Sequence, residues 1–98
     1  MHGEFKTPGG KLVVVDFAVS EGRLTDVRVT GDFFVYPDES FGAIQEALEG
    51  VSLTMSESAM AERVRLAIPD GTELLGTSPQ AIAAAVHRAL NEPTGDQS

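Results

Sequence analysis

Two alternating runs, KLVVVDFAV at residues 11–19 and RLTDVRVT at residues 23–30, carry the most regular pattern in this chain. Successive residues of a β-strand point to opposite faces, so each run can bury one face and leave the other wetter. The residues predicted on the buried faces are Val13, Val15, Phe17, Val19, Thr25, Val27 and Val29. Ser20-Glu21-Gly22 lies between the runs and contains a glycine, which tight turns favour. The pattern therefore predicts an antiparallel β-hairpin.

The residues that follow the hairpin predict one further extended segment. Gly31-Asp32 interrupts the alternation, and residues 33–36, FFVY, resume an apolar run. A glycine inside a strand pattern marks a bulge or a bend. We therefore expect a third strand, or an extension of the second, after Gly31.

Three helices are predicted in the remainder of the chain. The first begins at residues 37–40, PDES, and ends at Gly50, because acidic residues suit a helix N-terminus and glycine suits the position after a helix. The second begins at Ser56 and ends at the turn 69–71, after which residues 73–76 are predicted to be a connector. The third begins at Ser78-Pro79 and stops at Pro93. Their predicted apolar faces are Phe41, Ile44 and Leu48; Met60, Val64 and Ile68; and Ile82, Val86, Ala89 and Leu90.

This order of elements predicts the α+β class: an antiparallel β-hairpin or three-stranded sheet followed by three helices packed on one face. A chain of 98 residues is long enough for one domain. We expect that domain to span residues 1–93 and residues 94–98 to form a disordered tail.

Composition and charge exclude several classes of function. The chain has 42% hydrophobic residues, no cysteine and no run of ~18 apolar residues, so disulfides, thiolate sites and membrane spans are not expected. The N-terminus lacks the features of a secretory signal, and we expect a cytoplasmic protein. Seven basic and fifteen acidic residues give a net charge of −8, which disfavours binding to nucleic acid. The acidic excess lies in residues 37–98, where it suits a solvated face or a basic partner.

The stretch KTPGGKL at residues 6–12 is the strongest candidate for a binding site. Proline fixes φ and glycine permits positive φ, so Pro8, Gly9 and Gly10 can turn sharply and leave backbone N–H groups bare. Bare N–H groups beside the ammonium groups of Lys6 and Lys11 can cradle an anion such as a phosphate. The alternative interpretation is an ordinary surface turn.

A second motif, Gly31-Asp32-Phe33-Phe34, is expected near the first one. The glycine-rich stretch precedes the first strand of the hairpin, and the second motif follows its second strand. These two ends are neighbours in an antiparallel pair, so we expect Lys6 and Lys11 to lie beside Gly31 and Asp32 at one end of the sheet.

No motif predicts catalysis by this chain itself. His2 and His87 have no partner at metal-ligand spacing, and neither a nucleophile elbow nor a Walker A sequence is present. Asp38 and Glu39 at a helix start are interpreted as capping groups. We therefore expect no catalytic residue and no metal site.

Taken together, the quoted motifs resemble a known family. The matching residues are His2-Gly3-Glu4, Lys6, Pro8-Gly9-Gly10-Lys11-Leu12, Gly31-Asp32-Phe33-Phe34 and Pro37. They are similar to the C-terminal accessory domain of lipoate–protein ligases, which is a separate small subunit in some prokaryotes. The resemblance covers residues 2–50 well, and it covers residues 51–92 only by helix pattern and length.

The resemblance implies an accessory subunit that packs on a separate catalytic subunit of the biotin/lipoate ligase fold, forming a heterodimer. The catalytic partner would use ATP, Mg²⁺ and lipoate to form lipoyl-adenylate and would then acylate a lysine on a lipoyl carrier domain. This chain would bind no cofactor and have no turnover alone, and it would be needed chiefly for the activation step. Lys6, Pro8, Gly9, Gly10 and Lys11 would lie near the partner's nucleotide, with Gly31, Asp32 and Phe33 in support.

Two other interpretations stay open. The chain is also similar in expected fold to small iron–sulfur scaffold proteins, which suggests a free-standing partner-binding or scaffold module without catalysis. The absence of cysteine disfavours cluster assembly itself, since thiolate ligands are missing. The third interpretation is a structural or regulatory domain in which residues 6–12 form only a turn.

Overall fold

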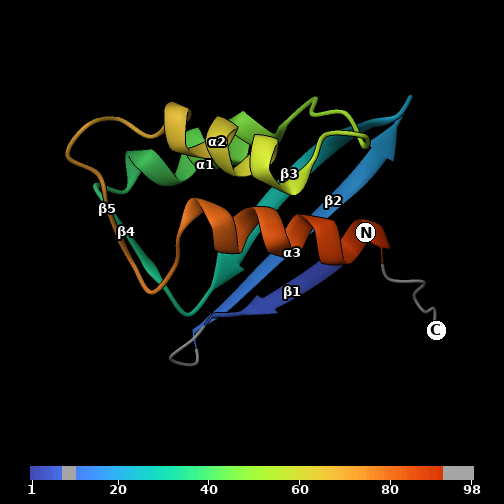
Figure 1. The fold of residues 1–98 in the computed structure, drawn as a ribbon. Helices are drawn as coiled ribbons and strands as arrows, with labels where there is room; N and C mark the ends of the chain where they lie inside the picture. The colour runs from blue at the N-terminus through green and yellow to red at the C-terminus, as the bar shows by residue number, and fades with distance from the viewer. Residues whose placement is uncertain (8–10, 92–98) are drawn as a thin grey trace.

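A computed structural model describes residues 1–7 and 11–91 of the chain. It contains a three-stranded sheet, a two-stranded ribbon and three helices (Figure 1). The elements are β1 (His2–Lys6), β2 (Leu12–Ser20), β3 (Arg23–Gly31), β4 (Phe34–Tyr36), α1 (Glu39–Leu48), α2 (Glu57–Ala67), β5 (Glu73–Leu75) and α3 (Pro79–Asn91). The predicted α+β class, with an antiparallel three-stranded sheet followed by three helices, is confirmed. The predicted tail at residues 94–98 lies outside the described residues.

The third strand of the sheet is not the one that the sequence predicted. The strand order is β1-β2-β3, so the N-terminal residues form an edge strand that pairs with β2 from His2↔Asp16 to Lys6↔Leu12. The predicted strand at residues 33–36 becomes β4, which pairs with β5 instead of the sheet. Residues 73–76, predicted as a connector, therefore contribute three residues to a strand.

The β2–β3 hairpin is present, but its alternation is interrupted. The register shifts between Asp16 and Ala18, and Asp26 has a positive φ of 54°, which is typical of a β-bulge. In a regular strand, residues three apart point to opposite faces. Because of the bulge, Leu24 and Val27 are nevertheless both buried. Val19 was predicted to be buried and is 39% exposed.

Helix α1 and its C-cap residue, Glu49, cover the open edge of β3 with polar side chains. The N–H of Val27 donates to Oε2 of Glu49, and the N–H of Val29 donates to Oε1 of Gln45, both at 2.8 Å. An unpaired strand edge invites aggregation unless it is covered or paired. These two bonds satisfy backbone donors of β3 that no further strand reaches.

The three helices lie on one face of the sheet, and the hydrophobic core lies between the two layers (Figure 1). Two helix starts follow the predicted caps: Ser56 Oγ accepts from the N–H of Ala59, and Ser78 Oγ accepts from the N–H of Ala81, each at 3.1 Å. Asp38 stands at the N-cap position of α1, but its side chain makes no capping hydrogen bond, so its predicted capping role is not confirmed. The largest fully buried apolar residues are Leu24, Ile44, Leu48, Met60, Ile82, Val13, Val15, Val29, Val64 and Val86. No helix within the described ranges is long and apolar enough to cross a bilayer.

The alanine-rich helix α3 packs closely on β1. A Cβ added at Gly3 would lie 2.3 Å from the carbonyl oxygen of Ala85 and 2.7 Å from Cβ of Ala89. The small residues on both elements therefore allow an unusually short approach of helix to strand. This contact holds the N-terminal edge strand against the helical layer.

Candidate functional site

The two lysines of the glycine-rich stretch stand at the two ends of the β1–β2 connection. Lys6 is the last residue of β1 and pairs with Leu12, and Lys11 directly precedes β2. The backbone N–H of Thr7 donates to the carbonyl oxygen of Lys11 at 2.7 Å, and its Oγ1 donates to the same oxygen at 3.0 Å. Pro8, Gly9 and Gly10 lie outside the described residues.

The second motif lies against the start of β2, as its position in the hairpin predicted. Gly31 pairs with Val13, and the N–H of Asp32 donates to the carbonyl oxygen of Leu12 at 2.9 Å. A Cβ added at Gly31 would lie only 2.1 Å from that same oxygen. The structure therefore brings Gly31 and Asp32 next to the end of the glycine-rich stretch.

A third segment, which the sequence analysis missed, completes this cluster. Gly76 follows β5 with a φ of +91°, and a Cβ there would lie 3.1 Å from Cγ of Lys11 and 3.4 Å from Cβ of Phe33. It would also lie 3.5 Å from the carbonyl oxygen of Asp32. Lys11, Asp32 and Phe33 thus meet at Gly76, which has both the backbone conformation and the lack of a side chain that this contact needs.

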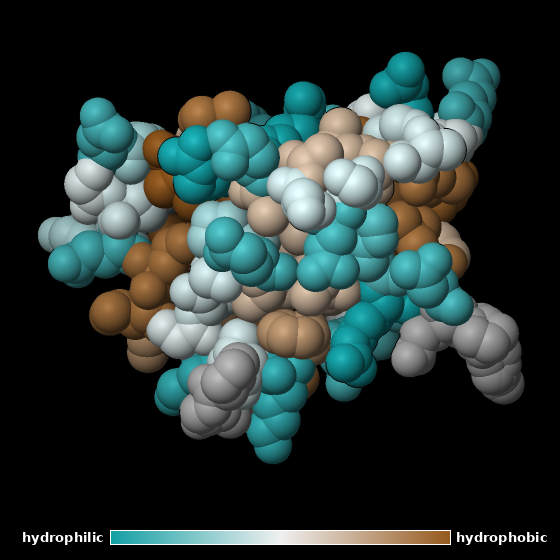
Figure 2. All heavy atoms as spheres, in the orientation of Figure 1, coloured by the Kyte–Doolittle hydropathy of each residue, from teal (hydrophilic) through white to brown (hydrophobic). Residues whose placement is uncertain are grey.

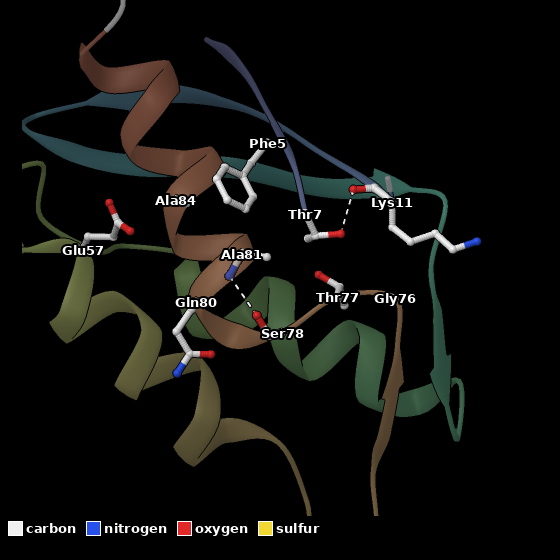
Figure 3. Close-up of a pocket in the computed structure, with 10 residues that line it drawn as sticks. All are labelled: Phe5, Thr7, Lys11, Glu57, Gly76, Thr77, Ser78, Gln80, Ala81 and Ala84. Atoms are coloured by element: carbon white, nitrogen blue, oxygen red, sulfur yellow. Dashed lines mark hydrogen bonds between the residues drawn. The ribbon is translucent and has the colours of Figure 1, made fainter. Parts of the chain in front are cut away.

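Two of these three segments, the β1–β2 connection and the residues after β5, border a cavity of about 460 Å³ at the N-terminus of α3 (Figure 3). Its lining residues are Phe5, Thr7, Lys11, Glu57, Gly76, Thr77, Ser78, Gln80, Ala81 and Ala84. Figure 3 shows the hydroxyl groups of Thr7, Thr77 and Ser78 near one another, with the Lys11 side chain extending outward beside them. Apart from Lys11 and Glu57, the lining is uncharged.

The two lysines do not share this cavity. Gly3 is buried and Phe5 half-buried on the helix-covered face of β1, whereas His2, Glu4 and Lys6 are exposed. Because strand residues alternate between faces, Lys6 belongs to the outer face of the sheet. Lys11 lines the cavity together with Thr7. The structure describes two residues of the predicted loop, Lys6 and Lys11. Only Lys11 of these two lies on the cavity side of the sheet, next to Asp32 and Phe33.

The cavity combines groups that attract an anion with one carboxylate, that of Glu57. The N-terminus of a helix carries a partial positive charge, and α3 begins at this cavity with Ser78 as its cap. Lys11 adds an ammonium group, and Oγ1 of Thr77 is buried without a hydrogen-bond partner. Within residues 1–7 and 11–91, no cluster of His, Cys, Asp and Glu could hold a metal ion.

A separate ionic cluster lies on the outer face of the sheet. Nδ1 of His2 lies 2.7 Å from Oδ1 of Asp16, and its Nε2 lies 2.8 Å from Oε2 of Glu4. The hydrogen bonds of His2 with Glu4 and then Asp16 raise its pKa. Asp16 stands directly opposite Arg28 in the β2–β3 register, and its carboxylate contacts His2.

We predict a small, pH-dependent stabilisation from this cluster. Because the pKa of His2 is higher in the folded protein, the stabilisation is full below its ordinary value of about 6.5 and is lost as pH rises through the raised value. His2 is about half exposed, so solvent screening limits the effect to roughly 0.2–1 kcal/mol. Urea unfolding of the native chain and His2→Gln should differ more at pH 5.5 than at pH 8.5. An equal difference at both pH values would contradict the prediction.

The fold of this chain is similar to that of a chain in a solved structure. One chain of the structure described as "a bi-partite lipoate protein ligase and its E2 lipoyl domain from Thermoplasma acidophilum" is similar to this chain, with a TM-score of 0.67 and 21% sequence identity. The similarity covers 88% of this chain and 92% of that one, so it spans nearly the whole of two chains of similar length. No protein-family model matches the sequence, and no curated protein matches it.

Proposed function

We propose that this chain is the non-catalytic accessory subunit of a bipartite lipoate–protein ligase, required for the ATP-dependent activation of lipoate. Three observations support the proposal. The motifs at residues 2–12 and 31–37 resemble the family's accessory domain, and the whole fold is similar to one small chain of a bipartite ligase system. The third observation carries the proposal furthest: Lys11, Asp32 and Phe33 meet at Gly76, and Lys11 and Gly76 line a cavity.

The chemistry of activation explains what such a subunit would contribute. The lipoate carboxylate attacks the α-phosphorus of ATP, the bond to pyrophosphate breaks, and negative charge grows on the phosphoryl oxygens. A positioned ammonium group stabilises that charge most in a site that excludes water. The product is a mixed anhydride that water hydrolyses, so closure of the site also protects it. We assign the ammonium group to Lys11 and the closure to the docking of this chain on its partner.

Reconstitution tests the proposal. The catalytic lipoate–protein ligase chain of the source organism is incubated with lipoate, ATP and Mg²⁺, with and without this chain, and lipoyl-adenylate is measured in a single turnover. We expect neither chain alone to form adenylate at an appreciable rate and the mixture to do so. A catalytic chain that makes adenylate at the full rate by itself would refute the accessory role. Transfer from chemically supplied lipoyl-adenylate to the carrier domain is measured in parallel and should depend less on this chain.

A further inference from the structure

The outer face of the β4–β5 ribbon exposes three large apolar side chains. Phe34 is 74% exposed, Tyr36 is 68% exposed and Leu75 is 57% exposed. Phe34 pairs with Leu75 across the ribbon, and Tyr36 stands two residues from Phe34, so all three share one face. Val35 and Leu74 alternate with them and pack against the hydrophobic core. The ribbon therefore uses one face for its own fold and leaves the other uncovered, with these three apolar side chains beside the carboxylate of Glu73, which stands opposite Tyr36.

This apolar face continues into a groove. A hollow of about 310 Å³ lies beside β4, and its lining residues are Thr30, Gly31, Phe33, Phe34, Val35, Asp38 and Phe41. The rings of Phe33 and Phe41 meet edge to face, with centroids 6.1 Å apart. Figure 2 shows apolar atoms gathered at the end of the molecule where β4 and β5 lie. A protruding apolar strand face beside an aromatic groove is the shape in which protein interfaces place their central contacts.

Charge at the edges of this face indicates which kind of partner it fits. Asp32, Asp38, Glu39 and Glu73 are exposed carboxylates next to the ribbon strands or opposite them. A second copy of this chain would bring the same carboxylates together, in a molecule that already has a net charge of −8, and an anionic lipid surface would repel them. A protein surface with apolar groups ringed by lysine and arginine is complementary.

We infer that this ribbon face, made of Phe34, Tyr36, Leu75 and the adjoining groove, docks the catalytic ligase chain. The inference rests on the proposed function, because that function supplies the partner. Gly76 directly follows Leu75 and contacts Lys11, so a partner seated on the ribbon also reaches the mouth of the cavity. The residues that dock the partner and the Lys11 ammonium group would then belong to one continuous surface.

Binding measurements with matched substitutions test the inference. The catalytic ligase chain of the source organism is titrated with the native chain, Phe34→Ser, Tyr36→Ser and, as a control, Val19→Ser. Val19 is another exposed apolar strand residue, but it lies at the β2–β3 turn, at the far end of the sheet (Figure 1). We expect the two ribbon variants to weaken the Kd at least tenfold, because buried aromatic groups dominate interface energies, and Val19→Ser to stay within twofold. Circular dichroism checks that each variant keeps the native fold.

The outcomes separate this inference from the proposed function. If the native chain supports adenylate formation while both ribbon variants bind as tightly as it does, the docking face is wrong and the accessory role stands. If the native chain neither binds nor supports adenylate formation, both are wrong. If sedimentation shows a dimer of this chain that the ribbon variants dissociate, the face is a contact between copies and the inference is overturned. Tenfold losses confined to the ribbon variants would establish it.

Discussion

Lys11→Ala should lower the rate of lipoyl-adenylate formation by the reconstituted ligase about 10²-fold, the scale expected for removing one group that stabilises transition-state charge. The reason is the position of the residue. Lys11 stands beside Asp32, Phe33 and Gly76 on the cavity side of the sheet, where its ammonium group can approach a partner's nucleotide. Single-turnover formation of the adenylate is the measurement, with both chains at concentrations that saturate their complex.

Lys6→Ala is the matched control for that experiment. Both lysines bracket the same turn, but Lys6 belongs to the exposed outer face of β1 with His2 and Glu4. We expect the Lys6 variant to stay within about threefold of the native chain. Lys11→Arg should recover part of the lost rate, since it keeps the charge with a different shape. Equal losses in the Lys6 and Lys11 variants, or full activity of Lys11→Ala, would refute the assigned role.

The transfer step tests whether the role of Lys11 is confined to activation. When lipoyl-adenylate is supplied, acylation of the carrier lysine no longer needs charge stabilisation at the attacked α-phosphorus. Lys11→Ala should therefore slow transfer far less than it slows activation. If both steps fall equally, the role of Lys11 is not confined to activation and the charge argument fails.

Local hydrogen bonds explain why the helices could be predicted from the sequence. Ser56 and Ser78 accept bonds from N–H groups three residues ahead, so the starts of α2 and α3 are encoded within one turn of chain. Gly50 adopts a φ of +77° just after α1, as a helix-terminal glycine does. Signals of this kind need no knowledge of the tertiary structure.

Pairings between distant segments explain what the sequence did not reveal. The ribbon pairs β4 with β5, although α1 and α2 separate the two strands in the sequence. Each strand has three residues, which is too short to show a period of two. β1 has a single large apolar residue, Phe5, because Gly3 occupies the position that α3 approaches closely. Gly76 belongs to the candidate site only through its contacts with Lys11 and Phe33, which no local pattern of residues 73–76 contains.

Gly31→Ala should destabilise the protein by about 2–4 kcal/mol, because two costs add at this position. The φ of +147° is a conformation that residues with a side chain rarely adopt, and the added Cβ would lie 2.1 Å from the carbonyl oxygen of Leu12. That oxygen also accepts the N–H of Asp32, so the clash cannot be relieved without moving the hydrogen-bonded end of the hairpin. Urea unfolding followed by circular dichroism measures the change.

Gly42→Ala is the matched substitution with the opposite expected sign. Gly42 lies inside α1, and an added Cβ there meets no atom within 4 Å, so alanine should raise the free energy of unfolding by up to ~1 kcal/mol through helix propensity. Equal stabilities of the Gly31 and Gly42 variants would contradict the close approach of residue 31 to β2. Where Gly31→Ala still folds at low temperature, displacement of Asp32 and Phe33 should also disturb Lys11. Adenylate formation should then fall in that variant while Gly42→Ala keeps the native rate, which would tie the shape of the hairpin end to activation itself.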